Sequence, residues 1–140
     1  MSIQKSESDK GFRGYIFSRS INNNFIPQRV QNLVIKDFAS RKKLFFKLSS
    51  TEYIMENCFH MLKALVKEIK LLNGIIFYSI EMLPKKKNLR DSYIKKILKE
   101  KKTIYFALEE IKISSLKEYK KLDTILKIKF ASKEYNLKND

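Results

Sequence analysis

The stretch Asn73-Gly74-Ile75-Ile76-Phe77-Tyr78-Ser79 decides the fold. Apolar residues recur at helical spacing over residues 58–72, and Asn or Gly commonly ends a helix. The apolar run over residues 75–78 is typical of a strand that is covered on both faces. This junction therefore predicts a helix that leads directly into a buried strand of a parallel sheet.

The same alternation extends from this junction in both directions. The patterns predict strands over residues 13–18, 44–48, 75–78 and 103–108, and helices over residues 27–40, 58–72 and 89–98. Strands that alternate with helices are typical of a parallel sheet with helices on both faces. We therefore predict a three-layer α/β domain with a mostly parallel sheet of four or five strands. Its strand order should be 2-1-3-4, the resolvase-like or flavodoxin-like order.

The chain divides into three predicted segments. Residues 1–11 are expected to form a flexible tail, residues 12–113 the α/β domain, and residues 114–140 a C-terminal extension. The apolar residues of this extension fit a helix, although Leu126, Ile128 and Phe130 alternate with lysines as they would in a strand. We predict a helix that begins near Ser115, and this segment could also join subunits of a homo-oligomer.

The chain of 140 residues carries a formal net charge of +15. One interpretation is an anionic partner, such as a sugar phosphate, a nucleotide sugar, nucleic acid or a membrane surface. The other interpretation is the lysine bias of an AT-rich genome, spread over solvated faces. Abundant Lys, Ile and Asn beside three Gly, two Pro and no Trp favour the second interpretation.

Several classes of protein are excluded by what the sequence lacks. A single cysteine excludes an internal disulfide, and Cys58 and His60 are two residues apart, so they would face different sides of a helix. We therefore expect no metal, and three glycines provide no glycine-rich loop for a phosphate cofactor. The first ten residues lack the apolar stretch of a signal peptide, and no run could span a bilayer, which predicts a cytoplasmic protein.

Polar residues follow each predicted strand. In open α/β sheets, ligands bind just outside the carboxyl ends of the strands. The candidate catalytic residues are Ser18, as a nucleophile, and Glu52, as a general acid or base. The candidate ligand-binding residues are Arg19, Gln28, Arg29, Ser50, Tyr53, Tyr78, Ser79 and Glu109. We expect one pocket where Ser18, Arg19, Ser50, Glu52, Tyr53, Ser79 and Glu109 converge, with Arg19 as the anion contact.

Each of these groups also has a structural interpretation. The serines and threonine of residues 49–51 could cap the following helix, and residues 18–20 could be a polar loop. Arg29 in a first helical turn fits either a bound anion or plain surface charge. Glu109 could orient Arg19 or Arg29 through an ion pair. Because no known catalytic triad is present, the sequence leaves open whether the protein is an enzyme.

Several spaced motifs resemble the sporadic carbohydrate cluster family of bacterial surface-polysaccharide gene clusters. The resemblance covers about residues 12–112. Its motifs are Gly14-Tyr15-Ile16, Ser18-Arg19, Pro27 with Val30-Gln31-Asn32, Ser50-Thr51-Glu52-Tyr53 with Met55, Met61-Leu62, Gly74-Ile75 with Tyr78-Ser79, Leu83-Pro84, and Ala107 with Glu109. The resemblance implies a role in surface carbohydrate biosynthesis, as an enzyme or a ligand-binding accessory that acts on an anionic sugar or nucleotide sugar.

The order of the elements is also similar to the catalytic domain of serine recombinases. That resemblance implies a serine after the first strand that attacks DNA phosphate, and arginines that stabilise the charge. The arginine expected before the nucleophile is replaced near Phe17, and Glu81 and Met82 occupy the place of an Asp-Arg pair. No helix-turn-helix follows. The alternative function is therefore a recombinase-like DNA-binding or structural module without strand-exchange activity.

Overall fold

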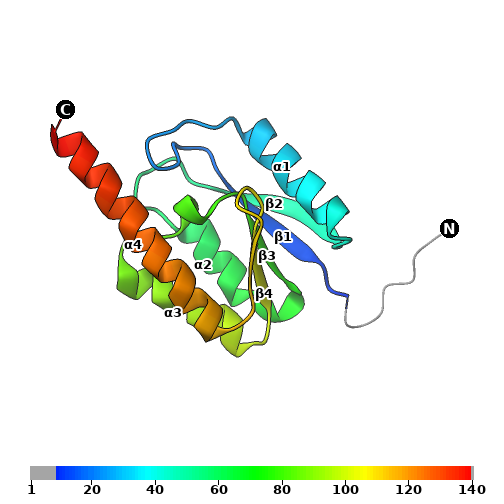
Figure 1. The fold of residues 1–140 in the computed structure, drawn as a ribbon. Coiled ribbons are helices and arrows are strands. Elements are labelled where there is room, and N and C mark those ends of the chain that lie inside the picture. Colours follow the sequence, from blue (N-terminus) through cyan, green and yellow to red (C-terminus); the bar gives the residue numbers. More distant parts are fainter. Residues whose placement is uncertain (1–8, 140) are drawn as a thin grey trace.

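A five-stranded sheet with the order β2-β1-β3-β4-β5 forms the centre of the protein (Figure 1). The computed structural model describes the backbone of residues 9–139 and the side chains of residues 9–132. The strands are β1 (Phe12–Phe17), β2 (Phe46–Glu52), β3 (Gly74–Phe77), β4 (Thr103–Phe106) and β5 (Ile111–Ile113). The first four strands are parallel, and β5 is antiparallel to β4. The predicted three-layer, mostly parallel sheet with the order 2-1-3-4 is confirmed.

Helices cover both faces of this sheet. They are α1 (Gln28–Arg41), α2 (His60–Lys67), α3 (Lys87–Lys99) and α4 (Leu116–Asn139), with short 3-10 helices η1 (Ile69–Leu71) and η2 (Ile80–Met82). Helix α1 packs on β1 and β2, whereas α2 and α3 pack against each other on the opposite face (Figure 1). This arrangement follows from right-handed crossovers, because the chain moves outward to β2 and then back across the sheet to β3 and β4.

The central strands carry the core. All four residues of β3 are buried, and the side chains of Tyr15 and Ile75 are fully enclosed. A Cβ atom added to Gly74 would lie 1.8 Å from the carbonyl oxygen of Thr103, so only glycine allows β4 to approach β3 at this point. The glycine that ends the predicted helix therefore also sets the pairing of the two strands.

Strand β2 differs from the prediction. It begins at Phe46 and continues to Glu52, so residues 49–52 lie inside the strand instead of following it. The reason is its register, which pairs Gly14 with Ser49 and Phe17 with Glu52 along the full length of β1. A Cβ atom on Gly14 would lie 2.3 Å from Ser49 Oγ, so this glycine makes room for the polar strand.

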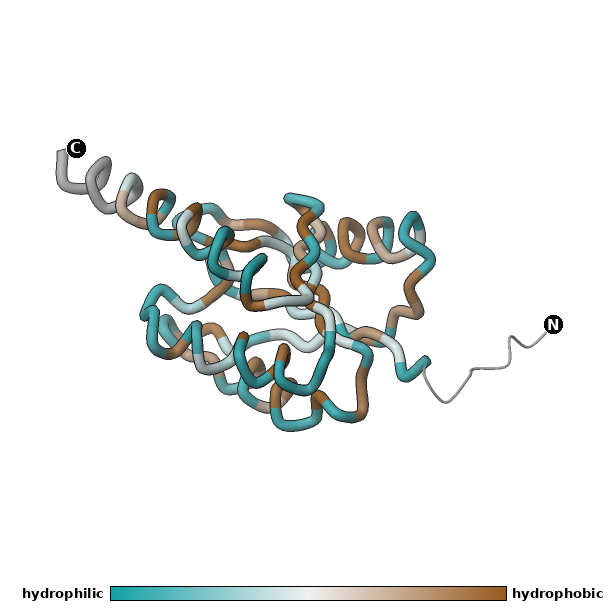
Figure 2. Tube along the Cα trace, turned by 60° about the horizontal axis from the view of Figure 1, so that its bottom comes forward, coloured by the Kyte–Doolittle hydropathy of each residue, from teal (hydrophilic) through white to brown (hydrophobic). Residues whose placement is uncertain are grey.

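Other element boundaries also move. Helix α2 begins at His60 instead of Cys58 and passes into η1, so the predicted helix over residues 58–72 is broken near Glu68. Strand β4 ends at Phe106, and the fifth strand was not assigned from the sequence. Hydrophobic residues recur between hydrophilic ones along the helices (Figure 2). The helical spacing of such residues is the pattern that predicted these elements.

The C-terminal segment is helix α4, which lies beside α3 (Figure 1). Leu122 and Leu126 of α4 are buried, and Tyr119 Oη donates a hydrogen bond of 2.6 Å to Asp91 of α3. The helix is therefore part of the packed structure. The division into tail, domain and extension stays a prediction, and residues 1–8 of the tail lie outside the described part of the chain. Within residues 9–139, no helix is long and apolar enough to cross a membrane.

Candidate functional site

Glu52 lies at the end of β2 and binds the first turn of α2. Its side chain is 1% exposed, and its carboxylate accepts hydrogen bonds of 3.0–3.1 Å from the backbone N–H groups of Met61 and Leu62. It also accepts from Tyr15 Oη at 2.8 Å and from the backbone N–H of Tyr53 at 3.0 Å. A carboxylate at this helix end satisfies orphan N–H groups and complements the helix dipole. The hydrogen bonds of the Glu52 carboxylate therefore stabilise the fold.

The phenol of Tyr15 is fixed by the same carboxylate. Burial, and secondarily the charge of Glu52, raises the pKa of Tyr15 far above its ordinary value. The phenol therefore stays protonated and donates to Glu52. This buried pair connects the middle of β1 to the end of β2 and to α2.

Ser18 and Arg19 follow β1 and hold the loop after β2. Ser18 Oγ donates to the backbone carbonyl of Glu52 at 2.9 Å. Nη1 of Arg19 donates at 2.8–2.9 Å to the carbonyls of three loop residues, which are Tyr53, Met55 and Cys58. The guanidinium also lies 4.2 Å from the centre of the Phe17 ring and 5.1 Å from that of Phe59. Arg19 thus fixes the conformation of residues 53–58.

Ser79 and Glu109 form a second polar group at the ends of β3 and β4. Ser79 Oγ donates to Glu109 Oε2 at 2.6 Å, and the backbone N–H of Ile80 donates to Oε1 at 3.0 Å. Burial and the charge of Glu109 raise the pKa of the enclosed Tyr78. The partner of Glu109 is thus the turn that starts η2, in place of the predicted arginine.

The remaining predicted residues lie apart from these two groups. Ser50 Oγ accepts from Arg13 Nη2 at 2.8 Å. Tyr53 is 47% exposed, and its ring stacks on His60 with 5.5 Å between ring centres. Gln28 and Arg29 are exposed at the start of α1. Most candidate residues are therefore distributed over several places along the carboxyl edge, and Ser50 lies inside β2.

A cavity of about 540 Å³ opens at this carboxyl edge. Its lining comes from three segments, which are residues 17–25 after β1, residues 54–59 after β2, and residues 81–85 after β3. Among the predicted site residues, only Ser18 and Arg19 line it. The geometry gives no support to the predicted convergence of the other five residues on this cavity. Their side chains make the contacts described above instead.

Asparagines form part of this cavity that the sequence did not reveal. Asn22, Asn23 and Asn57 line it, and all three have positive φ angles of 48°, 71° and 61°. Asparagine tolerates this left-handed region better than most residues. The asparagine-rich stretch after β1 was visible as a polar loop, but nothing in it indicated that residues 54–59 and 81–85 would face it.

Gln31 is a further residue that sequence reasoning missed. It is fully buried in α1, and its side chain pairs with both the N–H and the carbonyl of Phe17 at 2.9 and 2.8 Å. It also donates to the carbonyl of Ile26 at 2.8 Å. Gln31 therefore holds the end of β1 and the entry to α1 together. A lone glutamine in an otherwise apolar helical stripe was the only available signal.

Two solved structures share this fold. The N-terminal catalytic domain of TP901-1 integrase has a TM-score of 0.59 at 16% identity, over 91% of this chain and 98% of that one. A resolvase family site-specific recombinase from Streptococcus pneumoniae has a TM-score of 0.60 at 12% identity, over 91% of each chain. At this level of identity, the likeness shows the fold, which is that of a recombinase catalytic domain.

No protein-family model matches the chain, and no curated protein matches it either. The resemblance to the sporadic carbohydrate cluster family therefore stays a hypothesis, and so does a role in surface carbohydrate synthesis. The similar structures agree better with the alternative hypothesis, a module with the recombinase fold.

Proposed function

We propose that the protein is a nucleic-acid-binding module with the recombinase fold that does not cut or rejoin strands. The observation that carries this proposal is the distribution of positive charge. Residues 85–129 contain fifteen of the thirty basic residues and six of the fifteen acidic ones, so about a third of the chain has a net charge of +9. A local excess of this kind attracts polyanions.

Much of this charge lies on two neighbouring helices. Helices α3 and α4 run antiparallel, because Tyr119 contacts Asp91 while Asp123, further along α4, contacts Arg90 and Lys87. The α3–α4 face is defined here by six exposed lysines, which are Lys95, Lys96, Lys99, Lys117, Lys120 and Lys121. Among the side chains of residues 9–132, no ion pair engages these six. Their charge is therefore available to phosphate groups.

The surroundings of Ser18 support binding without strand exchange. A serine nucleophile needs a neighbouring base that accepts its proton. The Ser18 hydroxyl donates to a backbone carbonyl, and the nearby carboxylate of Glu52 is occupied by Tyr15 and by the N–H groups of α2. Nη1 of Arg19 is engaged with loop carbonyls. The Ser18 hydroxyl is therefore not paired with a base that would activate it for attack on a phosphodiester.

Two charge-matched variants test the proposal. The first carries Lys95→Gln, Lys99→Gln and Lys120→Gln on the α3–α4 face. The control carries three substitutions of the same kind on α1, its C-terminal end and β2, namely Lys36→Gln, Lys42→Gln and Lys47→Gln. Both variants lose three positive charges, so they separate a local surface from the effect of net charge.

The measurement is the affinity for a labelled DNA duplex, by fluorescence anisotropy, over a series of salt concentrations. Each lost phosphate contact lowers the slope of log K against log [salt] by about 0.9, so the first variant should lose up to about 2.7. The control should keep the slope of the unmodified chain. Equal weakening in both variants would contradict a defined surface, and a covalent serine–DNA adduct would contradict the absence of strand exchange.

A second candidate function is self-association through α4. Ile125 and Ile128 of α4 are 46% and 66% exposed, although the helix buries its other apolar face. Removing the segment after Ile113 would be a poor test, because Leu122 and Leu126 belong to the core. Ile128→Lys leaves that core intact. Sedimentation at several concentrations should show a larger species that this variant loses, and a monomer throughout would reject this candidate.

A further inference from the structure

The cavity at the carboxyl edge is independent of the α3–α4 face. Its volume of about 540 Å³ falls within the range of a few hundred to about 1,000 Å³ that is usual for small-molecule sites. Three loops that are far apart in the sequence meet around it. The residues that line the cavity therefore indicate which kind of ligand it would bind.

The charges of the lining balance each other. Arg19 and Lys85 are opposed by Glu56 and Glu81, and Glu81 also pairs with Lys129 Nζ, outside the lining, at 3.8 Å. Nη1 of Arg19 already donates to three carbonyls, and the amine of Lys85 lies 5.8 Å from the ring of Phe130. A phosphate or carboxylate would meet the carboxylates of Glu56 and Glu81, of which only Glu81 has an ion-pair partner among the described side chains. The cavity therefore favours an uncharged ligand, in contrast to the anionic ligand that the sequence suggested.

Asn22 supplies an acceptor that lacks a donor. The residue is 8% exposed, and its Nδ2 donates to Glu81 Oε1 at 3.0 Å. Its Oδ1 is enclosed and has no hydrogen-bond partner within the described residues. A buried acceptor without a partner is unfavourable. A turn of the Asn22 side chain toward the cavity, which this residue lines, would let a ligand hydroxyl group provide the missing donor.

The backbone fixes this amide in place. The backbone N–H and carbonyl groups of Ile21 and Asn24 form two hydrogen bonds of 2.8 and 3.0 Å, which close a tight turn. Asn22 and Asn23 are its central residues, and both have positive φ angles. A turn that is held in this way loses little conformational freedom when a ligand binds.

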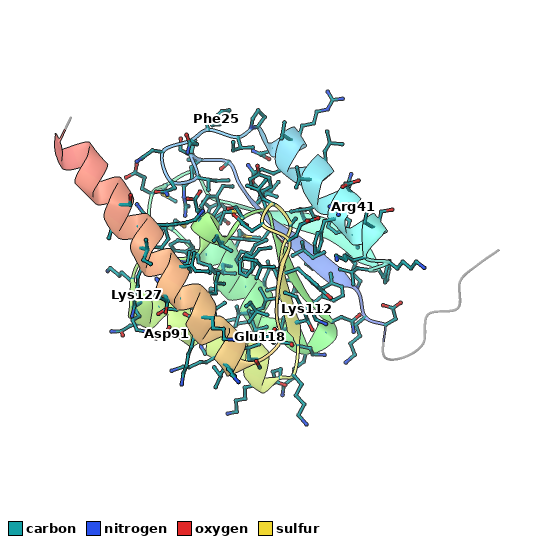
Figure 3. All side chains as sticks on the ribbon, viewed as in Figure 1. Phe25, Arg41, Asp91, Lys112, Glu118 and Lys127 are labelled. Atoms are coloured by element: carbon teal, nitrogen blue, oxygen red, sulfur yellow. The ribbon has the colours of Figure 1, made fainter. Side chains whose placement is uncertain are left out.

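An apolar wall faces these polar groups. Phe25, labelled in Figure 3, lies on the loop between β1 and α1. It is 67% exposed, and Ile54, which also lines the cavity, is 71% exposed. Phe59 also lines the cavity. Apolar rings beside amide and carboxylate groups suit a ligand that has one face of C–H groups and an edge of hydroxyls. A sugar ring has this character.

We infer that the cavity binds an uncharged saccharide unit, with its C–H face on Phe25 and its hydroxyls toward Asn22 and Glu81. The test is an NMR titration of the full isotope-labelled chain, with the side-chain amides of Asn22, Asn23 and Asn57 as reporters. The probes are the methyl glycosides of glucose, galactose and N-acetylglucosamine, then adenosine, then inorganic phosphate. At least one glycoside should give saturable shifts at these amides.

Matched variants distinguish the cavity from other surfaces. Phe25→Ala should weaken glycoside binding at least about tenfold, because it removes the exposed ring. Leu33→Ala removes another exposed apolar side chain, 58% exposed on α1, and should have no effect. Asn22→Gly keeps the positive φ and should weaken binding about five- to tenfold, the loss expected for one hydrogen bond. Lys101 also has a positive φ angle but lies outside the cavity, so Lys101→Gly is the control for Asn22→Gly.

Three results would overturn the inference. Binding of phosphate or adenosine alone would assign the cavity to a different ligand. Glycoside shifts that survive both Phe25→Ala and Asn22→Gly would place the sugar elsewhere. The absence of saturable shifts with every glycoside would reject a saccharide as the ligand of the cavity. None of these results depends on whether the α3–α4 face binds DNA.

Discussion

Replacement of Glu52 should lower the stability of the folded protein, independently of any activity. In Glu52→Ala, the buried phenol of Tyr15 and the N–H groups of Met61 and Leu62 lose their acceptor. Each unsatisfied buried donor costs about 1–3 kcal/mol, and water that enters the space recovers part of this. Loss of the charge at the start of α2 adds about 0.3–1 kcal/mol.

These contributions overlap, so they do not simply add. We expect Glu52→Ala to lower the free energy of unfolding by about 3–5 kcal/mol, at the low end of the sum for three unsatisfied donors and the lost helix-end charge. Glu52→Gln keeps the shape but brings an NH₂ group against N–H donors, and it should cost about 1–3 kcal/mol. Against a total stability of about 5–15 kcal/mol, both effects are readily measured.

The assay is urea unfolding followed by circular dichroism, with Glu56→Ala as the control. Glu56 is exposed on the adjacent loop, and its removal should change the stability by no more than about 0.5 kcal/mol. A double-mutant cycle with Tyr15→Phe should show coupling, because the two side chains are in contact. If Glu52→Gln unfolds at the same urea concentration as the unmodified chain, the carboxylate does not serve the fold as argued, and a chemical role returns.

Three further predictions concern stability. Arg90→Ala should cost up to about 3–5 kcal/mol, because buried Asp123 loses its shortest ion pair and keeps only the longer contacts with Lys87 and Lys127. Burial alone would raise the pKa of Asp123, but the hydrogen bond and charge of Arg90 outweigh it and hold that pKa below its ordinary value. The stabilisation that ionised Asp123 provides is therefore complete above its unfolded pKa of about 3.9, and it is lost as the pH falls through the lower folded pKa. Acid unfolding of the Asp123→Asn variant should no longer show this loss. Gln31→Ala should cost about 2–4 kcal/mol by urea unfolding, since it leaves both backbone groups of Phe17 without their partner. A change below about 0.5 kcal/mol, which is usual for a surface substitution, would contradict this. Gly74→Ala should cost at least about 3 kcal/mol in a thermal unfolding assay, because its Cβ would collide with a backbone carbonyl, and a variant as stable as the unmodified chain would show that β4 can move away.

The buried strands were predictable because their signal is local. The run at Ile75 is apolar on both faces, and burial in a sheet that helices cover on both sides requires such a run. Strand β2 lies at the edge of the sheet and carries Ser49, Ser50 and Thr51, so its composition resembles a loop. Its length is decided by pairing with β1 and by the space that Gly14 leaves, which are contacts between segments distant in the chain.

The candidate site was predictable in its place but not in its members. Parallel strands end at one edge, and the cavity opens there between the loops that follow β1, β2 and β3. Which side chains face it depends on the direction of each loop. Arg19 turns toward the carbonyls of residues 53–58, and the tight turn at Asn22 brings the asparagines to the cavity. The residues at the strand ends do not predict the direction of Arg19 or of the turn at Asn22.

The polar residues at the strand ends share one physical task, which is to tie a neighbouring segment to the sheet. Glu52 holds the start of α2, Arg19 holds the loop after β2, and Glu109 holds the turn into η2. Side chains engaged in this way are poor nucleophiles and bases, since their protons and lone pairs are already used. They are, however, well suited to support residues further out on the loops, because binding groups need a rigid second layer. Substitutions of the tying residues should therefore reduce stability, whereas substitutions of Asn22 or Phe25 should change binding while the fold persists.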